Sequence, residues 1–255
     1  MGSEMCIRDR HNLNRQVLFT KSDVGSPKIL ATRRWLQSKL PGASIEVAWE
    51  LTDSMALDSY SPAKGGLDLG SLLESEALND TLEMEPLTVE ETQQVLRTTD
   101  QIIGCLDAMR PRVLADFLSS KINQPYINGG VKNFVSEYRE FAHTNLVERY
   151  GPQVAQDRQV FSCQEDGEVP MTSIVFTNAY AGAFQAIAAL QRLAGRSQST
   201  IESTYWNSHT NEVFVTKSSD ATVERQASVK ELEQALWPKP SVSTTKLPEE
   251  SAAGV

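Results

Sequence analysis

The alternation of short strand-like runs with amphipathic helical segments constrains the fold of this chain more than any other feature. Apolar residues recur at helical spacing in three segments, and short apolar or alternating runs lie between them. The expected helices span residues 27–40, 88–97 and 111–122. The expected strands span 45–51, 101–106, 125–128 and 133–142, with Gly129 and Gly130 in a turn. Such alternation favours an α/β fold, a Rossmann-like and mainly parallel sheet with helices on both faces.

Local signals mark the ends of the expected helices. Thr88 and Glu91 have the spacing of a capping box, in which each side chain bonds the other residue's backbone N–H. Pro41 and Gly42 end the helix that precedes them. These signals depend only on neighbours in the chain, so they set boundaries before any tertiary contact is known.

The last third of the chain has a different pattern, expected to include an antiparallel portion. Residues 143–170 are polar and are expected to form a surface loop. The run 171–190 carries no charge over twenty residues, a length that could span a bilayer. Its Thr, Ser, Asn and Gln residues favour instead a buried helix that ends near Leu193, with enough Ala and Gly for close packing in a core or a dimer. A hairpin is expected at 204–207 and 212–216, followed by a helix at 228–236.

Composition narrows the choice of partners. The chain has 255 residues and a formal net charge of -9, which suits one α/β domain and argues against a general nucleic-acid or anionic-membrane partner. Cys6, Cys105 and Cys163 lie far apart without a CxxC motif, so neither a disulfide framework nor a zinc site is expected. Cys105 falls in an apolar strand and is expected to be a core residue. A reducing cytoplasm is the default location.

Two polar features stand apart from the core pattern. Cations and amides gather before and at the start of the first helix, at Asn12, Arg15, Gln16 and Lys28. They are either a local anion site on an acidic protein or solvated charges around a helix start. Asp107 follows the strand expected at 101–106, where α/β sheets bind ligands, although an acid there can also cap a helix or lie in a solvated turn.

These residues form a set of motifs with a specific order and spacing. The motifs are Asn12-x-x-Arg15-Gln16, Asp23-Val24-Gly25-x-x-Lys28, Asp107 with Arg112 five residues later, QPYING at 124–129, and Ser162-Cys163-x-x-x-Gly167 before an apolar helix. Together they resemble the ThiF/MoeB/HesA family of ubiquitin-activating (E1-like) adenylyltransferases. The resemblance covers roughly residues 11–217, and that range is expected to be one ThiF-type adenylation domain.

The resemblance implies an enzyme that uses ATP and Mg²⁺ to activate a C-terminal carboxylate as an acyl adenylate. The substrate would be a small ubiquitin-like or sulfur-carrier protein, or a peptide. Arg15 and Lys28 would bind phosphate oxygens, because cations must neutralise the phosphates before a carboxylate can attack. Asn12 and Gln16 would orient phosphate or ribose without adding charge.

The resemblance also suggests roles for three residues further along the chain. Asp107 would hold Mg²⁺, whose remaining ligands would be phosphate and water. Arg112 would either position Asp107 or face the nucleotide. Cys163 would accept the activated acyl group or take part in sulfur transfer, and the alternative for this residue is a buried structural cysteine.

The chain departs from the family pattern in its first part. No Gly-rich nucleotide loop precedes Asn12, so the first βαβ unit is expected to be missing from a truncated domain. Residues 1–10 are expected to be a non-native leader, 54–86 an acidic insertion, and 218–255 a C-terminal extension that is disordered from about 238. The lack of paired CxxC motifs points to a zinc-free branch, and the family resemblance suggests a homodimer.

Two other functions stay open at this stage. A catalytically inactive E1-like scaffold, or the silent partner of an activating dimer, accords with the missing Gly-rich loop. A nicotinamide dehydrogenase has only the fold class in its favour. Neither a nucleic acid nor a membrane is expected as a partner.

Overall fold

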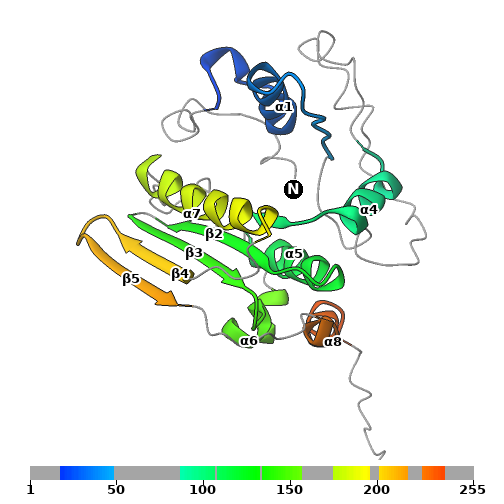
Figure 1. Ribbon diagram of the computed structural model, residues 1–255, viewed down its shortest axis with the longest axis vertical. Coiled ribbons are helices and arrows are strands. Elements are labelled where there is room, and N and C mark those ends of the chain that lie inside the picture. Colours follow the sequence, from blue (N-terminus) through cyan, green and yellow to red (C-terminus); the bar gives the residue numbers. More distant parts are fainter. Residues whose placement is uncertain are drawn as a thin grey trace, which may run out of the picture.

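The computed structural model describes residues 18–48, 87–106, 108–132, 134–156, 175–195, 201–217 and 226–238. The predicted leader, the acidic insertion and the tail from 239 onward lie outside these residues. Among the described residues, one five-stranded sheet organises the molecule (Figure 1). Its strands are β1 (Ile102–Gly104), β2 (Tyr126–Lys132), β3 (Val135–Phe141), β4 (Ile201–Asn207) and β5 (Glu212–Lys217), in that spatial order.

The sheet is mixed, so the prediction of a mainly parallel sheet is wrong for the described strands. Strands β1 and β2 are parallel and are joined through a helix, as parallel neighbours must be. The pairs β2–β3, β3–β4 and β4–β5 are antiparallel. Only residues 133 and 134 separate β2 from β3, and so short a connection allows only an antiparallel pair. The antiparallel portion predicted near the C-terminus is present and begins earlier than expected.

The helices cover both faces of this sheet, as predicted. They are α1 (Lys28–Lys39), α4 (Val89–Thr98), α5 (Met109–Lys121), α6 (Leu146–Tyr150), α7 (Val175–Leu193) and α8 (Gln226–Leu236), with short 3₁₀ turns η2 (Lys21–Asp23) and η4 (Pro152–Ala155). Helix α7 runs across one face of β2 and β3, whereas α5 and α8 pack together on the other side (Figure 1). Within the described part of the chain, none of the helices combines the length and apolar character needed to cross a bilayer.

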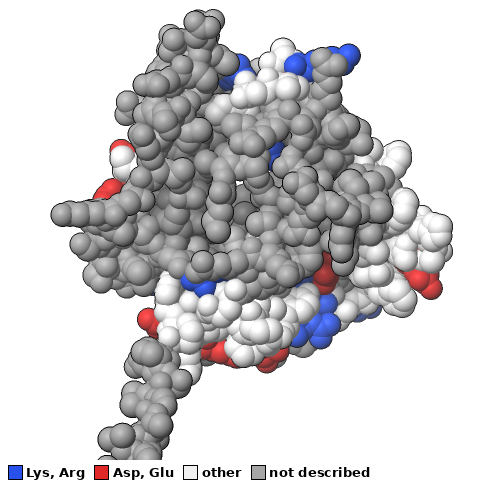
Figure 2. Space-filling model, turned by 180° about the vertical axis from the view of Figure 1, so that it is seen from behind, with Lys and Arg blue, Asp and Glu red and all other residues white. Residues whose placement is uncertain are grey.

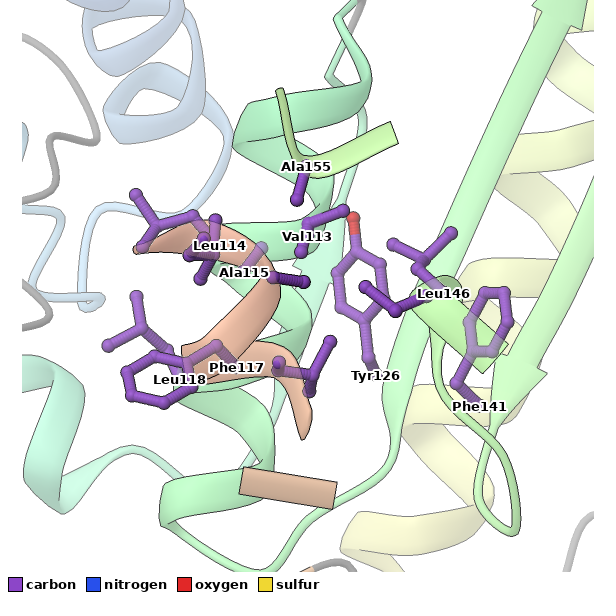
Figure 3. Packing of buried hydrophobic residues seen from close by; sticks show 13 residues of the cluster. Val113, Leu114, Ala115, Phe117, Leu118, Tyr126, Phe141, Leu146 and Ala155 are labelled. Carbon is purple, nitrogen blue, oxygen red and sulfur yellow. The ribbon is translucent and has the colours of Figure 1, made fainter. Parts of the chain in front are cut away.

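The larger hydrophobic cluster, here the α5 cluster, fills the space between α5, α6, α8 and the sheet. Helix α5 supplies five of its thirteen buried residues, and the rings of Tyr126 and Phe141 stack at a centroid distance of 6.2 Å. Figure 3 shows Tyr126 pointing between Val113 and Leu146. Helix α8 adds Leu232 and closes the far side of the cluster.

The smaller cluster, here the α7 cluster, lies on the opposite face of the sheet. It consists of Ile127, Tyr138, Ala188 and Ala189. Since successive strand residues point to opposite faces, Tyr126 and its neighbour Ile127 belong to different clusters. Strand β2 is therefore buried on both faces, which explains its continuous apolar start.

Three local predictions need correction. Strand β2 continues through Gly129 and Gly130, so these glycines form no turn. The region predicted as a loop at 143–170 contains α6 and η4, and residues 157–174 lie outside the described residues. Residues 45–48 are not in a strand, although the carbonyl of Val47 accepts a hydrogen bond from the Leu87 N–H at 2.7 Å.

Helix α6 forms because buried polar groups hold its start. The Asn145 side chain accepts a hydrogen bond from the Glu148 N–H at 2.8 Å, and the buried Asp116 carboxylate accepts one from the Leu146 N–H at 2.8 Å. Leu146 and Val147 are both buried in the α5 cluster. A turn this short has too few apolar residues to show a helical period in the sequence.

Candidate functional site

Several buried or partly buried polar side chains form hydrogen bonds at the carboxyl end of β1, directly before the predicted site residue Asp107 in the sequence. Strand β1 ends at Gly104, and the chain leaves the sheet through Cys105 and Leu106 toward Asp107. A Cβ atom at Gly104 would overlap with the Tyr126 side chain, so only glycine lets that ring lie against the strand end. In α/β sheets, ligands bind beyond the carboxyl ends of strands.

Arg112 reaches this segment from the first turns of α5. Its Nε donates to the carbonyl of Leu106 at 2.6 Å, and its Nη1 donates to Oδ1 of Asn128 at 3.3 Å. Both acceptors are neutral, and within the described ranges Arg112 forms no ion pair with a carboxylate. Arg112 thus brings a guanidinium whose two acceptors are neutral to the end of β1, and such a group suits an anionic ligand.

Asn128 and Tyr126 complete the polar group on the α5 face of β2. The Tyr126 hydroxyl donates to Oδ1 of Asn128 at 3.3 Å. Burial strongly raises the pKa of Tyr126, while the neighbouring Arg112 charge lowers it to a lesser extent. The phenol therefore stays protonated and acts as a donor, and Asn128 accepts from both neighbours.

Gln185 of α7 reaches the same segment from the opposite face of the sheet. Its Nε2 donates to the carbonyl of Gly104 at 2.8 Å, and its Oε1 accepts a hydrogen bond from the Cys105 thiol at 3.4 Å. Cys105 is exposed, so the prediction of a core cysteine is wrong. Strand β1 ends at Gly104, one residue before Cys105, so the thiol lies beyond the sheet.

The two glycines inside β2 are explained by these two side chains. A Cβ atom at Gly129 would lie 2.6 Å from the Gln185 amide carbon. One at Gly130 would lie 3.2 Å from Nη1 of Arg112. Because consecutive strand residues face opposite sides, the pair of glycines admits one polar side chain on each face.

The Asp23-Val24-Gly25 turn leads into α1 and places Lys28 at the first position of that helix. Gly25 has φ +95°, a conformation that other residues rarely adopt. Asp23 accepts a hydrogen bond from the Thr20 N–H at 2.8 Å and forms an ion pair with Arg34 at 3.2 Å. Lys28 is half-buried at the positive end of the helix dipole, an unfavourable place for a cation unless an anion lies nearby.

The structure describes two of the seven predicted site residues, Lys28 and Arg112. Asn12, Arg15, Gln16, Asp107 and Cys163 lie outside the described residues. Among the residues that are described, no group of three or more His, Cys, Asp and Glu side chains could hold a metal ion. On the face shown in Figure 2, described basic and acidic side chains are both present along the lower edge.

The sequence reading missed Gln185, Asn128 and Tyr126 as parts of this group. One sequence signal could have found Gln185. It is an amide in the middle of an uncharged helix, and a Gly-Gly pair inside an apolar run can mark a strand approached closely by other side chains. Asn128 and Tyr126 carry no such signal, because only the fold brings them against Arg112.

The structure is that of an α/β protein with a group of polar side chains at the carboxyl end of its parallel strand pair. A family model described as "ThiF family" matches residues 9–228 of this chain. The chain therefore belongs to the ThiF family of E1-like adenylyltransferases, as its motifs predicted.

Individual relatives agree with this assignment. The sulfur carrier protein adenylyltransferase of Thermus thermophilus is 26% identical over 141 residues, which cover 55% of this chain and 39% of that protein. Escherichia coli MccB solved with AMPCPP and MccA has a TM-score of 0.51 and 16% identity, covering 86% of this chain and 56% of that one. MccB solved with MccA-N7isoASN gives a TM-score of 0.50 at 13% identity, again covering 86% and 56%. The chain thus spans well under two thirds of these relatives, and the solved structures support the fold alone.

Proposed function

We propose that the full-length protein uses ATP and Mg²⁺ to convert the C-terminal carboxylate of a small carrier protein or peptide into an acyl adenylate. The observation that carries the proposal is the arrangement at the carboxyl end of β1. There Arg112, with no described acidic partner, holds the backbone of Leu106 directly before Asp107. Membership of the ThiF family makes adenylation the chemistry that this arrangement serves.

The chemistry requires positive charge around the triphosphate before reaction. A carboxylate oxygen must approach an α-phosphorus surrounded by negative oxygens, so positioning and charge neutralisation supply most of the catalysis. Lys28 at the start of α1, together with Arg15 and Arg112, would supply cations. Asn12 and Gln16 would orient phosphate or ribose.

Asp107 would hold the metal. Mg²⁺ commonly takes one or two carboxylates and completes its shell with phosphate oxygens and water, so it needs no cluster of acids. The bound ion would neutralise phosphate charge as pyrophosphate leaves. Arg112 would keep the backbone before Asp107 in place and face the nucleotide with its remaining charge.

The names of the relatives support a carrier protein or a peptide as substrate. The Thermus relative is named for a sulfur carrier protein, and the MccB structures contain MccA and, in one case, AMPCPP. In such a reaction Cys163 would receive the acyl group from the adenylate, because AMP is a good leaving group for thiolate attack. We also propose that the protein works in the cytoplasm.

A second candidate function is a scaffold or silent partner in an E1-like dimer. Helix α7 exposes large apolar side chains to solvent: Phe176, Leu190 and Leu193 are 70%, 65% and 64% exposed. An exposed apolar stripe of this kind often marks a protein contact. It also fits a homodimer of the active enzyme, so the stripe by itself does not choose between activity and silence.

ATP–pyrophosphate exchange with the full-length protein and candidate carriers or peptides tests the enzymatic proposal. Asp107→Ala should abolish exchange while the protein stays folded, because the metal loses its carboxylate. Asp100→Ala is the matched control, since Asp100 is an exposed acid at the amino end of β1, and it should leave exchange near the wild-type rate. Exchange that survives Asp107→Ala would remove Asp107 from the mechanism, and a wild-type protein without exchange would favour the scaffold.

The role of Cys163 has a separate test. Cys163→Ala should preserve ATP–pyrophosphate exchange, because adenylation precedes thiol attack. The same change should prevent a thioester from forming with the carrier, detected by gel shift or mass spectrometry under non-reducing conditions. A thioester that still forms would assign the acceptor to another group.

A further inference from the structure

Gln185 is a buried amide in α7, and hydrophobic packing does not explain why an amide lies there. It is 4% exposed, and the other buried residues of this helix are small, namely Thr177, Ala181, Ala188 and Ala189. Both ends of its amide are engaged at the end of β1, with Gly104 and with Cys105. Gly129 in β2 leaves the room that this side chain needs.

Arg112 holds the next residue of the same segment from the other face of the sheet. Its bond to the Leu106 carbonyl is 2.6 Å long, and its second bond anchors it to Asn128 of β2. The backbone or side chains of three successive residues, 104 to 106, are therefore fixed by two side chains from helices on opposite faces. We call this arrangement the β1 clamp, and Asp107 follows it directly in the sequence.

We propose that Gln185 is a positioning residue for adenylation, because it fixes the segment directly before Asp107, the residue proposed above to hold Mg²⁺. The proposal rests on the function proposed above and assigns Gln185 no contact with the nucleotide. Partners that orient a ligating group commonly change metal affinity or activity by about 10- to 100-fold when they are removed. Gln185 would act in this way through the backbone rather than through the carboxylate itself.

The amide is the required group because it donates at one end and accepts at the other. Leucine would fill much of the space but could neither donate to the Gly104 carbonyl nor accept from Cys105. Glutamate would match the shape of glutamine, but its ionised form would set an oxygen against the Gly104 carbonyl oxygen and bury a charge without a cation among its described contacts. A space-filling role therefore predicts that Gln185→Leu is tolerated, whereas a positioning role predicts that both variants fail.

Gln101 provides a matched control at the other end of β1. Its Nε2 donates to the Pro125 carbonyl at 2.6 Å, so it also joins a side-chain amide to a backbone carbonyl between β1 and β2. Gln101→Leu removes a bond of the same type without touching the segment before Asp107. An effect on general stability should appear in Gln101→Leu and in Gln185→Leu alike.

The experiment compares wild-type, Gln185→Leu, Gln185→Glu and Gln101→Leu full-length proteins by two measurements. The first is the Mg²⁺ concentration that gives half-maximal ATP–pyrophosphate exchange, which should rise about 10-fold in both Gln185 variants and not in Gln101→Leu. The second is backbone hydrogen–deuterium exchange without ATP or metal. Peptides covering residues 104–108 should exchange about 10-fold faster in the Gln185 variants only, because the clamp opens locally.

The outcomes separate the inference from the function on which it rests. If wild-type exchange depends on Asp107 but the Mg²⁺ requirement of Gln185→Leu stays at the wild-type value, the positioning role is overturned and the proposed function stands. If deuterium uptake at 104–108 is unchanged in the Gln185 variants, the clamp is overturned. If the wild-type protein shows no exchange with any carrier, the proposed function fails and the positioning role fails with it.

Discussion

On the α5 face of the sheet, helices α5, α6 and α8 bury a large apolar cluster, whereas on the α7 face a single helix buries a smaller one. The α5 cluster combines large side chains from α5, α6 and α8 with Tyr126 and Phe141 of the sheet. The α7 cluster holds few residues. The Phe184 ring of α7 packs against Tyr138, whereas Leu190 and Leu193 of the same helix are exposed. The larger share of the apolar burial therefore lies on the α5 face, while α7 contributes a smaller cluster, polar contacts and an exposed apolar surface.

The polar contacts on the two faces differ in the same way. On the α5 face Arg110 donates to the carbonyls of Ala155 and Leu236, and so ties α8 and η4 to α5. On the α7 face Gln185 reaches the end of β1, and Arg192 forms an ion pair with the buried Glu140 of β3. The Arg110 contacts join helices to one another, whereas those of Gln185 and Arg192 join α7 to the sheet.

The largest expected effect is a loss of stability from the α5 cluster. Leu114 is 2% exposed, and Leu114→Ala should lower the free energy of unfolding by about 2–5 kcal/mol because it leaves a cavity. Leu190→Ala, at a residue 65% exposed, should cost about 0.5 kcal/mol or less. Urea unfolding followed by circular dichroism measures both. Equal losses would contradict the unequal roles of the two faces.

The next effect tests how closely α7 approaches the sheet. Gly129→Ala should destabilise the protein by about 1–3 kcal/mol, because its Cβ would lie 2.6 Å from the Gln185 amide carbon. Gly182→Ala is the control within α7. Nothing lies within 4 Å of a Cβ there, so alanine should raise helix stability by up to about 1 kcal/mol.

The same approach predicts a coupling between Gly129 and Gln185. In the double variant Gly129→Ala with Gln185→Ala, the shorter side chain removes the overlap, so the two losses should not add. Thermal unfolding of the two single variants and the double variant measures the coupling. Simple additivity would show that Gly129 does not serve to admit Gln185.

A smaller effect is a loss of stability at alkaline pH, caused by Tyr126 of the α5 cluster. Burial raises the pKa of Tyr126 in the folded protein above the usual value of 10.0. The contribution of Tyr126 to stability is therefore complete below pH 10. Above pH 10 the unfolded state ionises first, so this contribution falls by about 1.4 kcal/mol for each pH unit. Unfolding measured from pH 9 to pH 11 should show this slope in the wild type, and Tyr126→Phe should reduce it. An unchanged slope in the variant would assign the alkaline loss to other groups.

The smallest effect on the stability of one chain should come from the exposed stripe of α7. Leu190→Glu leaves the buried residues of the α7 cluster in place, so the unfolding free energy of the monomer should change by about 0.5 kcal/mol or less. If the stripe is a homodimer contact, the variant should sediment as a monomer at concentrations where the wild type is a dimer. A wild-type protein that sediments as a monomer would show that the stripe is not a homodimer contact and would favour another binding partner.

Much of the local structure could be predicted from the sequence. The helix expected at 27–40 is α1, those expected at 111–122 and 228–236 are α5 and α8, and the predicted hairpin is β4–β5. The capping box predicted at Thr88 is present, with the Glu91 carboxylate accepting from the Thr88 N–H at 2.9 Å and the Thr88 hydroxyl accepting from the Glu91 N–H at 3.2 Å. Bonds that span three or four residues are set by neighbours in the chain, so patterns reveal them.

The candidate site was less accessible to sequence reasoning. The motifs predicted seven site residues, of which the structure describes Lys28 and Arg112, and the roles of all seven stay predictions. The contacts of Arg112 with Leu106 and Asn128 follow from the placement of α5 against β2, which no motif encodes. Cys105 was misassigned because an apolar run does not say where its strand ends.

The sequence by itself determined the hydrophobic periods of the helices and strands, the helix caps and the motifs. Through the motifs it also pointed to the ThiF family. Only the tertiary structure decided that β2 runs straight through Gly129 and Gly130, and that the sheet is mixed. It alone decided that Gln185 and Arg112 meet the same short segment from opposite faces. The physical reason is that local bonds depend on spacing along the chain, whereas these contacts join residues up to 81 positions apart, which only the packing of helices on a shared sheet brings together.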